Sequence, residues 1–122
     1  LPFESENKYM ISLHEKKSGG LVLYEKGAPE KLLEKSSEFF HHGKIKKIDS
    51  EERKKLLNNY SKLTSKGLRV IGVAFREIRN INKFPALAEI LSEKKDNFKI
   101  IWDEIDRDLI FIGFIAMVFI SL

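Results

Sequence analysis

Residues 21–30, with the sequence LVLYEKGAPE, place a short apolar run, a lysine, a glycine and a proline in immediate succession. A short apolar run favours a β-strand, and proline is common at the first position of a helix. The stretch therefore predicts a strand that ends near Lys26 and Gly27, followed by a helix that begins at Pro29. Because glycine has no Cβ, a ligand can approach Lys26 closely, and the amides at a helix start attract anions. The alternative interpretation is a solvated lysine at the end of an ordinary strand.

The preceding segment predicts the other half of a β-hairpin. Tyrosine, isoleucine and leucine occupy every second position over residues 9–14, which is the pattern of a half-buried strand. Residues 18–20, Ser-Gly-Gly, are typical of a turn. A turn centred between the first two of these residues places Lys26 opposite Ile11 or Ser12.

The rest of the chain predicts further strands and one long helix. A helix over residues 50–66 has Asp49 as its N-cap, with a glutamate three residues later, and Gly67 beyond its end. Residues 70–75 are continuously apolar and predict a central strand. Residues 109–122 are also mainly apolar but too few for a transmembrane helix, which needs about 20 residues, so a buried strand is expected. Together these elements predict an α+β fold in which helices flank an antiparallel β-sheet.

Composition narrows the functional classes. The 122 residues are 43% hydrophobic, which suits one domain with its own core. A net charge of +4 is compatible with a nucleic acid, an anionic membrane surface or a nucleotide as the binding partner. The absence of cysteine excludes disulfides and thiolate metal sites. The histidines lack the spacing of a helical metal pair, so no metal site is expected. The chain also lacks the pattern of a signal peptide.

Four segments carry a resemblance to a known family. They are residues 2–10 (PFESENKYM), 26–30 (KGAPE), 66–78 (KGLRVIGVAFREI) and 108–117 (DLIFIGFIAM). Each is similar to a motif of the nucleotide-binding (N) domain of P-type cation-transporting ATPases, and they occur in the family's order. The Gly-x-x-x-Met pattern of the last segment most resembles the calcium-pump-like P2 type. The resemblance covers nearly the whole chain.

The resemblance implies an ATP-binding site. One aromatic side chain stacks on adenine, an interaction of about 1–3 kcal/mol for bases on aromatic side chains. One apolar side chain lines the pocket, one glycine keeps it open, and three cationic side chains contact the phosphates. The aromatic residue is Phe3, the apolar residue is Met10 and the glycine is Gly27. The three cationic residues are Lys8, Lys26 and Arg69. No catalytic residue is expected in this chain.

The resemblance also implies how the chain relates to a complete pump. Residues 1–107 are expected to be part of the ATP-binding N domain, and residues 108–122 to hold a strand leading back toward the phosphorylation domain. The family continues with an Asp-Pro-Pro-Arg-like motif, whereas this chain ends in VFISL. The Asp-Lys-Thr-Gly motif that carries the phosphorylated aspartate is absent from the sequence, so ATP binding without turnover is expected.

In the complete pump, ATP hydrolysis drives cation transport across a membrane, and this domain lies on the cytoplasmic side. Its implied ligand is ATP, with Mg²⁺ in the parent enzyme, and its implied partners are the phosphorylation and membrane domains. Neither nucleic acid nor direct membrane insertion is expected. Two alternatives stay open from the residues alone. The basic helix at 50–66 suits a nucleic-acid-binding module, whose binding would weaken with salt. A non-catalytic interaction module would bind no ligand.

Overall fold

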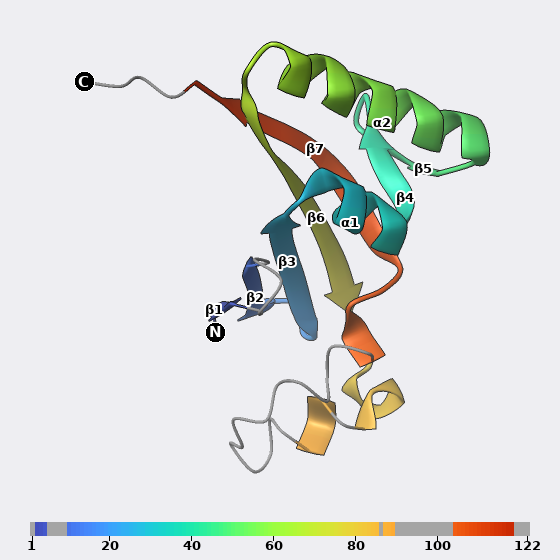
Figure 1. Ribbon diagram of the computed structural model, residues 1–122. Helices are drawn as coiled ribbons and strands as arrows, with labels where there is room; N and C mark the ends of the chain where they lie inside the picture. The colour runs from blue at the N-terminus through green and yellow to red at the C-terminus, as the bar shows by residue number, and fades with distance from the viewer. Residues whose placement is uncertain (1, 5–9, 86, 90–103, 119–122) are drawn as a thin grey trace.

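The computed structural model of the chain describes residues 2–4, 10–85, 87–89 and 104–118. Within these residues, seven strands form one sheet in the order β1-β2-β3-β6-β7-β4-β5 (Figure 1). Neighbouring strands are antiparallel, except β4 and β7, which are parallel. The strands are β1 (Pro2–Glu4), β2 (Met10–Glu15), β3 (Leu21–Gly27), β4 (Ser36–His41), β5 (Lys44–Lys47), β6 (Arg69–Ile78) and β7 (Leu109–Met117).

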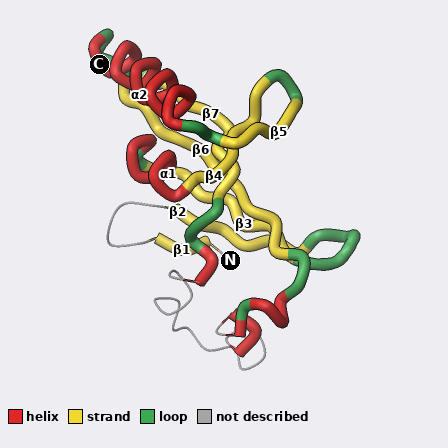
Figure 2. The backbone as a smooth tube through the Cα atoms, turned by 90° about the vertical axis from the view of Figure 1, so that its right-hand side faces the viewer, coloured by secondary structure: helices red, strands yellow, loops and turns green. Residues whose placement is uncertain are grey.

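Two α-helices lie on the same face of this sheet (Figure 2). Helix α1 (Pro29–Lys35) connects β3 to β4, α2 (Ser50–Ser65) connects β5 to β6, and a short 3-10 helix, η1 (Ile81–Lys83), follows β6. Both α-helices contact β6, and they contact each other. The α+β class that the sequence predicts is therefore confirmed, with one parallel strand pair in an otherwise antiparallel sheet.

The core lies between the sheet and α1. Leu32 and Leu33 of α1 belong to the same buried cluster as Leu23 of β3, Ala74 of β6 and Phe111 of β7, and each of the five is at most 1% exposed. Burying a leucine or phenylalanine contributes about 1.5–3 kcal/mol. Helices this short are unstable on their own, so packing on the sheet holds α1 in place.

Gly72 of β6 allows α1 to begin directly against the sheet. A Cβ atom at this position would lie 3.1 Å from Pro29 Cα, 3.1 Å from Leu32 Cδ1 and 3.2 Å from Phe111 Cε1. These distances are shorter than an ordinary van der Waals contact. The glycine within the apolar run of β6 therefore fixes how closely α1 and the sheet approach.

The β2–β3 hairpin differs from its prediction by one residue. The loop holds residues 16–20, whose two glycines adopt positive φ values that allow this loop to close. The pairing is centred on the middle of this loop, so Lys26 lies opposite Met10. The predicted partners, Ile11 and Ser12, are therefore wrong. Because a shift of one residue exchanges the two faces of a strand, the observed register leaves Ile11 in the core.

Helix α2 is close to its prediction. The side chain of Asp49 accepts a hydrogen bond of 2.8 Å from the backbone N–H of Glu52, as expected of an N-cap. The helix ends at Ser65, and Gly67 adopts a φ of 78°, a conformation that glycine tolerates.

The apolar segment near the C-terminus forms a strand over its described part. Strand β7 lies between β6 and β4, and its residues Leu109 and Phe111 are buried. Among the residues that the structure describes, no helix is long and apolar enough to cross a membrane.

Candidate functional site

Lys26 lies on the face of the sheet opposite to α1. It is exposed, and its backbone pairs with Met10 of β2 on one side and with Val73 of β6 on the other. Directly paired residues of antiparallel strands project from the same face, while the adjacent Glu25 projects into the core. The hairpin and β6 thus place Met10, Lys26 and Val73 in a row across three strands.

A hollow of about 260 Å³ surrounds this position. Its lining residues are Met10, Ile11, Ser12, Tyr24, Glu25, Lys26 and Val73. Small-molecule pockets usually measure about 300–1,000 Å³, so this hollow can hold a heterocycle or part of a larger ligand. Apolar side chains beside one ammonium group suit a ligand with both a flat apolar part and an anionic part.

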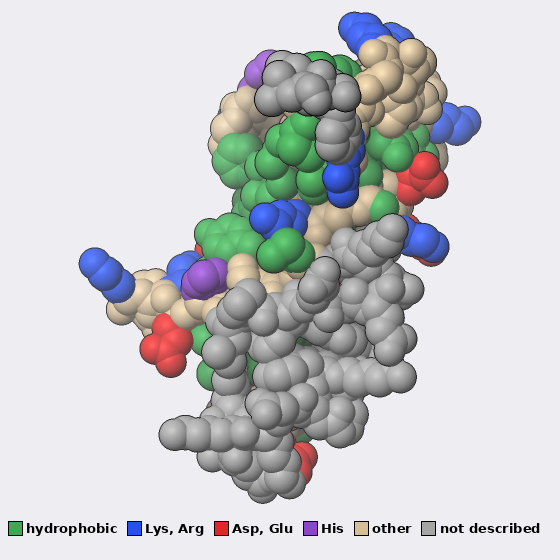
Figure 3. All heavy atoms as spheres, turned by 60° about the vertical axis from the view of Figure 1, so that its left-hand side comes forward, with side chains coloured by type: hydrophobic (Ala, Val, Ile, Leu, Met, Phe, Trp, Pro, Cys, Tyr) green, Lys and Arg blue, Asp and Glu red, His purple; other side chains and the backbone are tan. Residues whose placement is uncertain are grey.

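The side of the molecule shown in Figure 3 has a similarly mixed character. On the side shown in Figure 3, hydrophobic side chains lie next to lysine or arginine side chains outside the grey region. The rings of Tyr24 and His14 are 5.8 Å apart, and those of Tyr24 and Phe75 are 6.4 Å apart. His14 Nε2 also lies 3.0 Å from Ser12 Oγ. These contacts hold Tyr24 at the edge of the hollow.

Sequence reasoning missed five of the seven described residues that line this hollow, namely Ile11, Ser12, Tyr24, Glu25 and Val73. For Tyr24 a signal was available in the sequence, because it lies two positions before Lys26 and strand alternation puts both side chains on one face. Ser12 and Val73 could be added only once the strand pairing was known. The register of the strand pairing, and not a sequence motif, assigns these two residues to the site.

The other predicted residues lie at different distances from Lys26. Gly27 pairs with Gly72, which is the next pair along β3 and β6. The backbone of Phe3, in β1, pairs with Ile11, next to Met10. Lys8 lies outside the described residues. The structure therefore brings Met10 and Gly27 to Lys26 and puts the backbone of Phe3 on the strand beyond β2.

Arg69 lies further away. It is the first residue of β6, four positions before Val73, which corresponds to roughly 13 Å along a strand. Alternation places it on the same face as Val73, and its backbone pairs with Met117 of β7. Arg69 does not line the hollow at Lys26, so a ligand that contacts both cations has to extend along β6.

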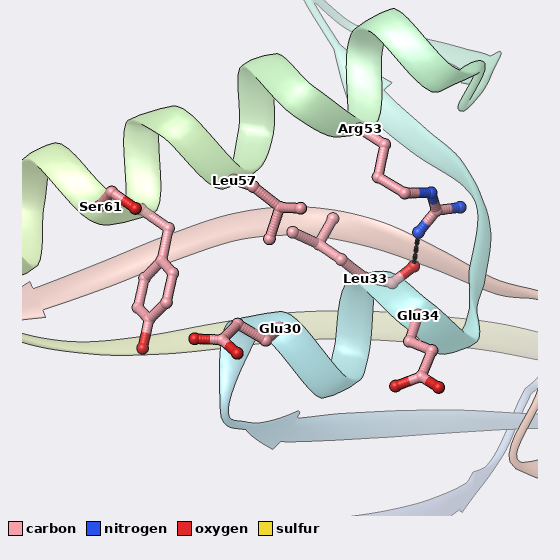
Figure 4. A pocket seen from close by; sticks show the side chains of 7 residues that line it. Glu30, Leu33, Glu34, Arg53, Leu57 and Ser61 are labelled. Carbon is pink, nitrogen blue, oxygen red and sulfur yellow. Dashed lines mark hydrogen bonds between the residues drawn. The ribbon is translucent and has the colours of Figure 1, made fainter.

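A second, larger hollow of about 510 Å³ lies between α1 and α2 (Figure 4). Its lining residues are Glu30, Leu33, Glu34, Arg53, Leu57, Tyr60 and Ser61. The guanidinium of Arg53 donates hydrogen bonds to the carbonyl oxygens of Leu33 and Ser36, so it is already engaged by the end of α1. The two glutamates would repel a phosphate group. The smaller hollow at Lys26 is therefore the better site for an anion.

A buried ionic cluster lies beneath Lys26, on the core side of β3. Glu25 is 1% exposed, and Lys35 Nζ lies 3.2 Å from Glu25 Oε1 and 2.5 Å from Asp106 Oδ2. Burial raises the pKa of Glu25 to about 8, helped by the neighbouring carboxyl group of Asp106 and opposed by Lys35. Burial also acts to lower the pKa of Lys35, but its interactions with Asp106 and Glu25 outweigh this and raise it.

The fold and the site define a class of protein: an α+β domain with a partly apolar hollow beside a lysine on the exposed face of its sheet. The sequence model of one family, described as "P-type ATPase, cytoplasmic domain N", matches residues 1–118. The chain therefore belongs to the P-type ATPases, within their cytoplasmic domain N.

Relatives agree with this assignment. The chain is similar to the sodium/potassium-transporting ATPase subunit alpha-2 of Gallus gallus, with 32% identity over 123 residues, covering 97% of this chain and 11% of that protein. It is equally similar to the Homo sapiens alpha-2 subunit. The alpha-B subunit of Artemia franciscana is 46% identical over 77 residues, covering 59% of this chain and 8% of that protein. The chain thus spans about a tenth of the length of these relatives.

Proposed function

We propose that this chain binds ATP at the hollow around Lys26. In this proposal the ammonium group of Lys26 contacts the phosphates, Met10 and Val73 provide apolar contacts, and Gly27 leaves room beside the lysine. The triphosphate extends from this point along the exposed face of the sheet.

Three further residues complete the proposed site. Phe3 stacks on the adenine ring, Lys8 is a second cation for the phosphates, and Arg69 contacts them from the start of β6. A guanidinium suits this task because its planar group can form two hydrogen bonds to one phosphate. ATP carries Mg²⁺ in the parent enzyme.

The observation that supports the proposal most strongly is the pairing of β2, β3 and β6. It puts one exposed cation between two apolar side chains on the face that α1 leaves open. In the larger hollow between α1 and α2 two carboxylates are present, and the cation that lines it, Arg53, is already bonded to backbone carbonyl oxygens. The family assignment makes a nucleotide the expected ligand. The basic-helix alternative loses one of its cations, because Arg53 faces α1.

For the parent protein, we propose a P-type pump that couples ATP hydrolysis to cation transport. The chain would hold ATP on the cytoplasmic side of the membrane, while a phosphorylation domain supplies the acceptor aspartate and a membrane domain carries the ion. The expectation of a calcium-type parent gains no support from the relatives, which are named as sodium/potassium pumps. We therefore propose a cation pump without assigning its ion.

The test is an ATP titration of the ¹⁵N-labelled chain, followed by backbone amide shifts. We expect saturable shifts around Met10, Lys26 and Val73. Replacing Lys26 with methionine keeps the length of the side chain but removes its charge, so ATP should bind about tenfold more weakly, the equivalent of about 1.4 kcal/mol.

Lys31 provides the matched control. It is another exposed lysine, on α1, and it does not line the hollow at Lys26. The Lys31→Met variant should bind ATP as the unmodified chain does. Equal weakening by both variants would mean that only general charge attraction is at work. Shifts confined to α2, with stronger binding of a DNA duplex than of ATP, would favour the nucleic-acid alternative.

A further inference from the structure

Two buried carboxylate oxygens beneath Lys26 have no partner. They are Glu25 Oε2 and Asp106 Oδ1, while the other oxygen of each carboxyl group contacts Lys35. An ionised carboxylate can only accept hydrogen bonds, so two ionised groups here would leave both oxygens unsatisfied. Because both carboxyl groups contact the same Lys35 Nζ atom, they are close neighbours, and a single proton shared by the two groups would satisfy both oxygens at once.

The surroundings of Glu25 favour this arrangement. On β3, its backbone pairs with Ile11 of β2 and Ala74 of β6, and both are buried apolar residues. The charged groups that face it, among the described residues, are Lys35 from α1 and Asp106 from the segment before β7. One ammonium group thus faces two carboxyl groups, and a shared proton makes the cluster neutral. A buried unbalanced charge would be costly.

The segment that carries Asp106 is itself fixed in place. The Nη1 atom of Arg76, in β6, donates hydrogen bonds to the carbonyl oxygens of Ile105 and Arg107, over 3.2 Å and 2.8 Å. These are the residues on either side of Asp106, so its carboxyl group is presented to β3 from a defined backbone position.

We propose that Glu25 and Asp106 share one proton and, together with Lys35, form a buried latch that positions Lys26. The latch joins three parts of the fold: the end of β3, the end of α1 and the segment before β7. Because Glu25 immediately precedes Lys26, fixing its side chain in the core fixes the backbone from which the lysine projects. Glu25 is thus a positioning residue. Its effect on ATP affinity rests on the proposed function, whereas the shared proton does not depend on that function.

The first test is a pH titration of the complete chain, followed by the ¹³C shift of the Glu25 carboxyl carbon and by the backbone amide shifts of Lys26 and Gly27. We expect the carboxyl midpoint well above the ordinary value for glutamate, about 4.3, and the same midpoint at both amides. In the Glu25→Gln variant, which stays neutral and can still donate a hydrogen bond to Asp106, the amide shifts should no longer follow that midpoint. An ordinary carboxyl midpoint in the unmodified chain would overturn the proposal, as would amides that do not respond; neither result depends on whether the variant folds.

The second test measures ATP affinity against pH for the same two proteins. Losing the shared proton should weaken binding by the unmodified chain by roughly threefold between about pH 7 and about pH 9, relative to Glu25→Gln. The titration of ATP itself is common to both proteins and cancels in the comparison. Identical pH profiles would overturn the positioning role. If neither protein binds ATP while Glu25 titrates as expected, the proposed function fails and the latch stands.

Discussion

Glu25 and Lys26 are consecutive residues with opposite environments. Strand alternation sends Glu25 into the core, where it is 1% exposed, and leaves Lys26 exposed on the other face. Burial penalises the charged form of the glutamate and raises its pKa, which favours the protonated form. On the surface the lysine is free of this cost and available to an anion.

The buried glutamate makes stability depend on pH. Its pKa is about 8 in the folded chain against 4.5 when exposed, so between these values the folded state binds more protons than the unfolded state. Glu25 therefore stabilises the fold most at low pH, and this contribution is lost as pH rises from about 4.5 to about 8, by at most about 1.4 kcal/mol per pH unit. Urea unfolding over this range should show a steeper loss for the unmodified chain than for Glu25→Gln.

The exposed Glu34 gives the control for this experiment. Its side chain is 74% exposed, so Glu34→Gln should leave the pH dependence of the free energy of unfolding as it is in the unmodified chain. If Glu25→Gln and the unmodified chain lose stability in parallel, Glu25 is ionised in the folded chain at neutral pH.

At this scale the sequence indicates part of the site. The contiguous strand, lysine and helix start drew attention to Lys26 and Gly27, but a solvated lysine was an equally open interpretation, and only the family resemblance assigned both residues to a site. The burial of Glu25 also has a signal, since it alternates with Leu21 and Leu23. Its partner Asp106 has none, because 81 residues separate the two along the chain and only the order of the strands brings them together.

Helix α1 depends on its neighbours for its stability. It has seven residues and no side-chain cap at its start, and Leu32 and Leu33 bury it against the sheet. Its distance from β6 is set by Gly72, above which the backbone of Pro29 lies. A helix held in this way should tolerate little added volume at the contact.

Replacing Gly72 with alanine should therefore destabilise the fold. Overpacking costs about 1–3 kcal/mol, and the lower chain entropy of alanine offsets about 0.5–1 kcal/mol of this. We expect a net loss of about 1 kcal/mol in the free energy of unfolding, measured with urea. The same change in a Leu32→Ala background should cost less, because one of the crowded atoms is gone. An equal cost in both backgrounds would mean that the Leu32 contact does not contribute.

The elements that sequence reasoning missed lack a local pattern. Strands β4 and β5 form an antiparallel hairpin in which Phe39 pairs with Lys46 and Phe40 with Ile45. Adjacent phenylalanines followed by adjacent histidines do not alternate, and β5 is exposed along its whole length. By contrast, α2 has an N-cap and a terminal glycine, and β6 is a long apolar run, so both were predicted.

On the scale of the whole molecule, the sheet is completed by pairings between strands that are distant in the sequence. Strand β7, from the end of the sequence, lies between β6 and β4 and is antiparallel to one and parallel to the other. It therefore connects the β4–β5 hairpin to the strands that carry Lys26. Although residues 108–122 were assigned to the exit from the domain, we propose that their strand is integral to this fold.

Removing β7 should accordingly abolish folding, and not merely shorten the sheet. A chain of residues 1–107 lacks the buried side chains of Leu109 and Phe111 and leaves β4 and β6 without their shared neighbour. We expect its ¹⁵N spectrum to collapse and its thermal unfolding to lose cooperativity. A chain of residues 1–118 keeps all of β7, so its spectrum and unfolding midpoint should match those of the complete chain. A well-dispersed spectrum from residues 1–107 would show that the first six strands fold without β7 and would contradict this prediction.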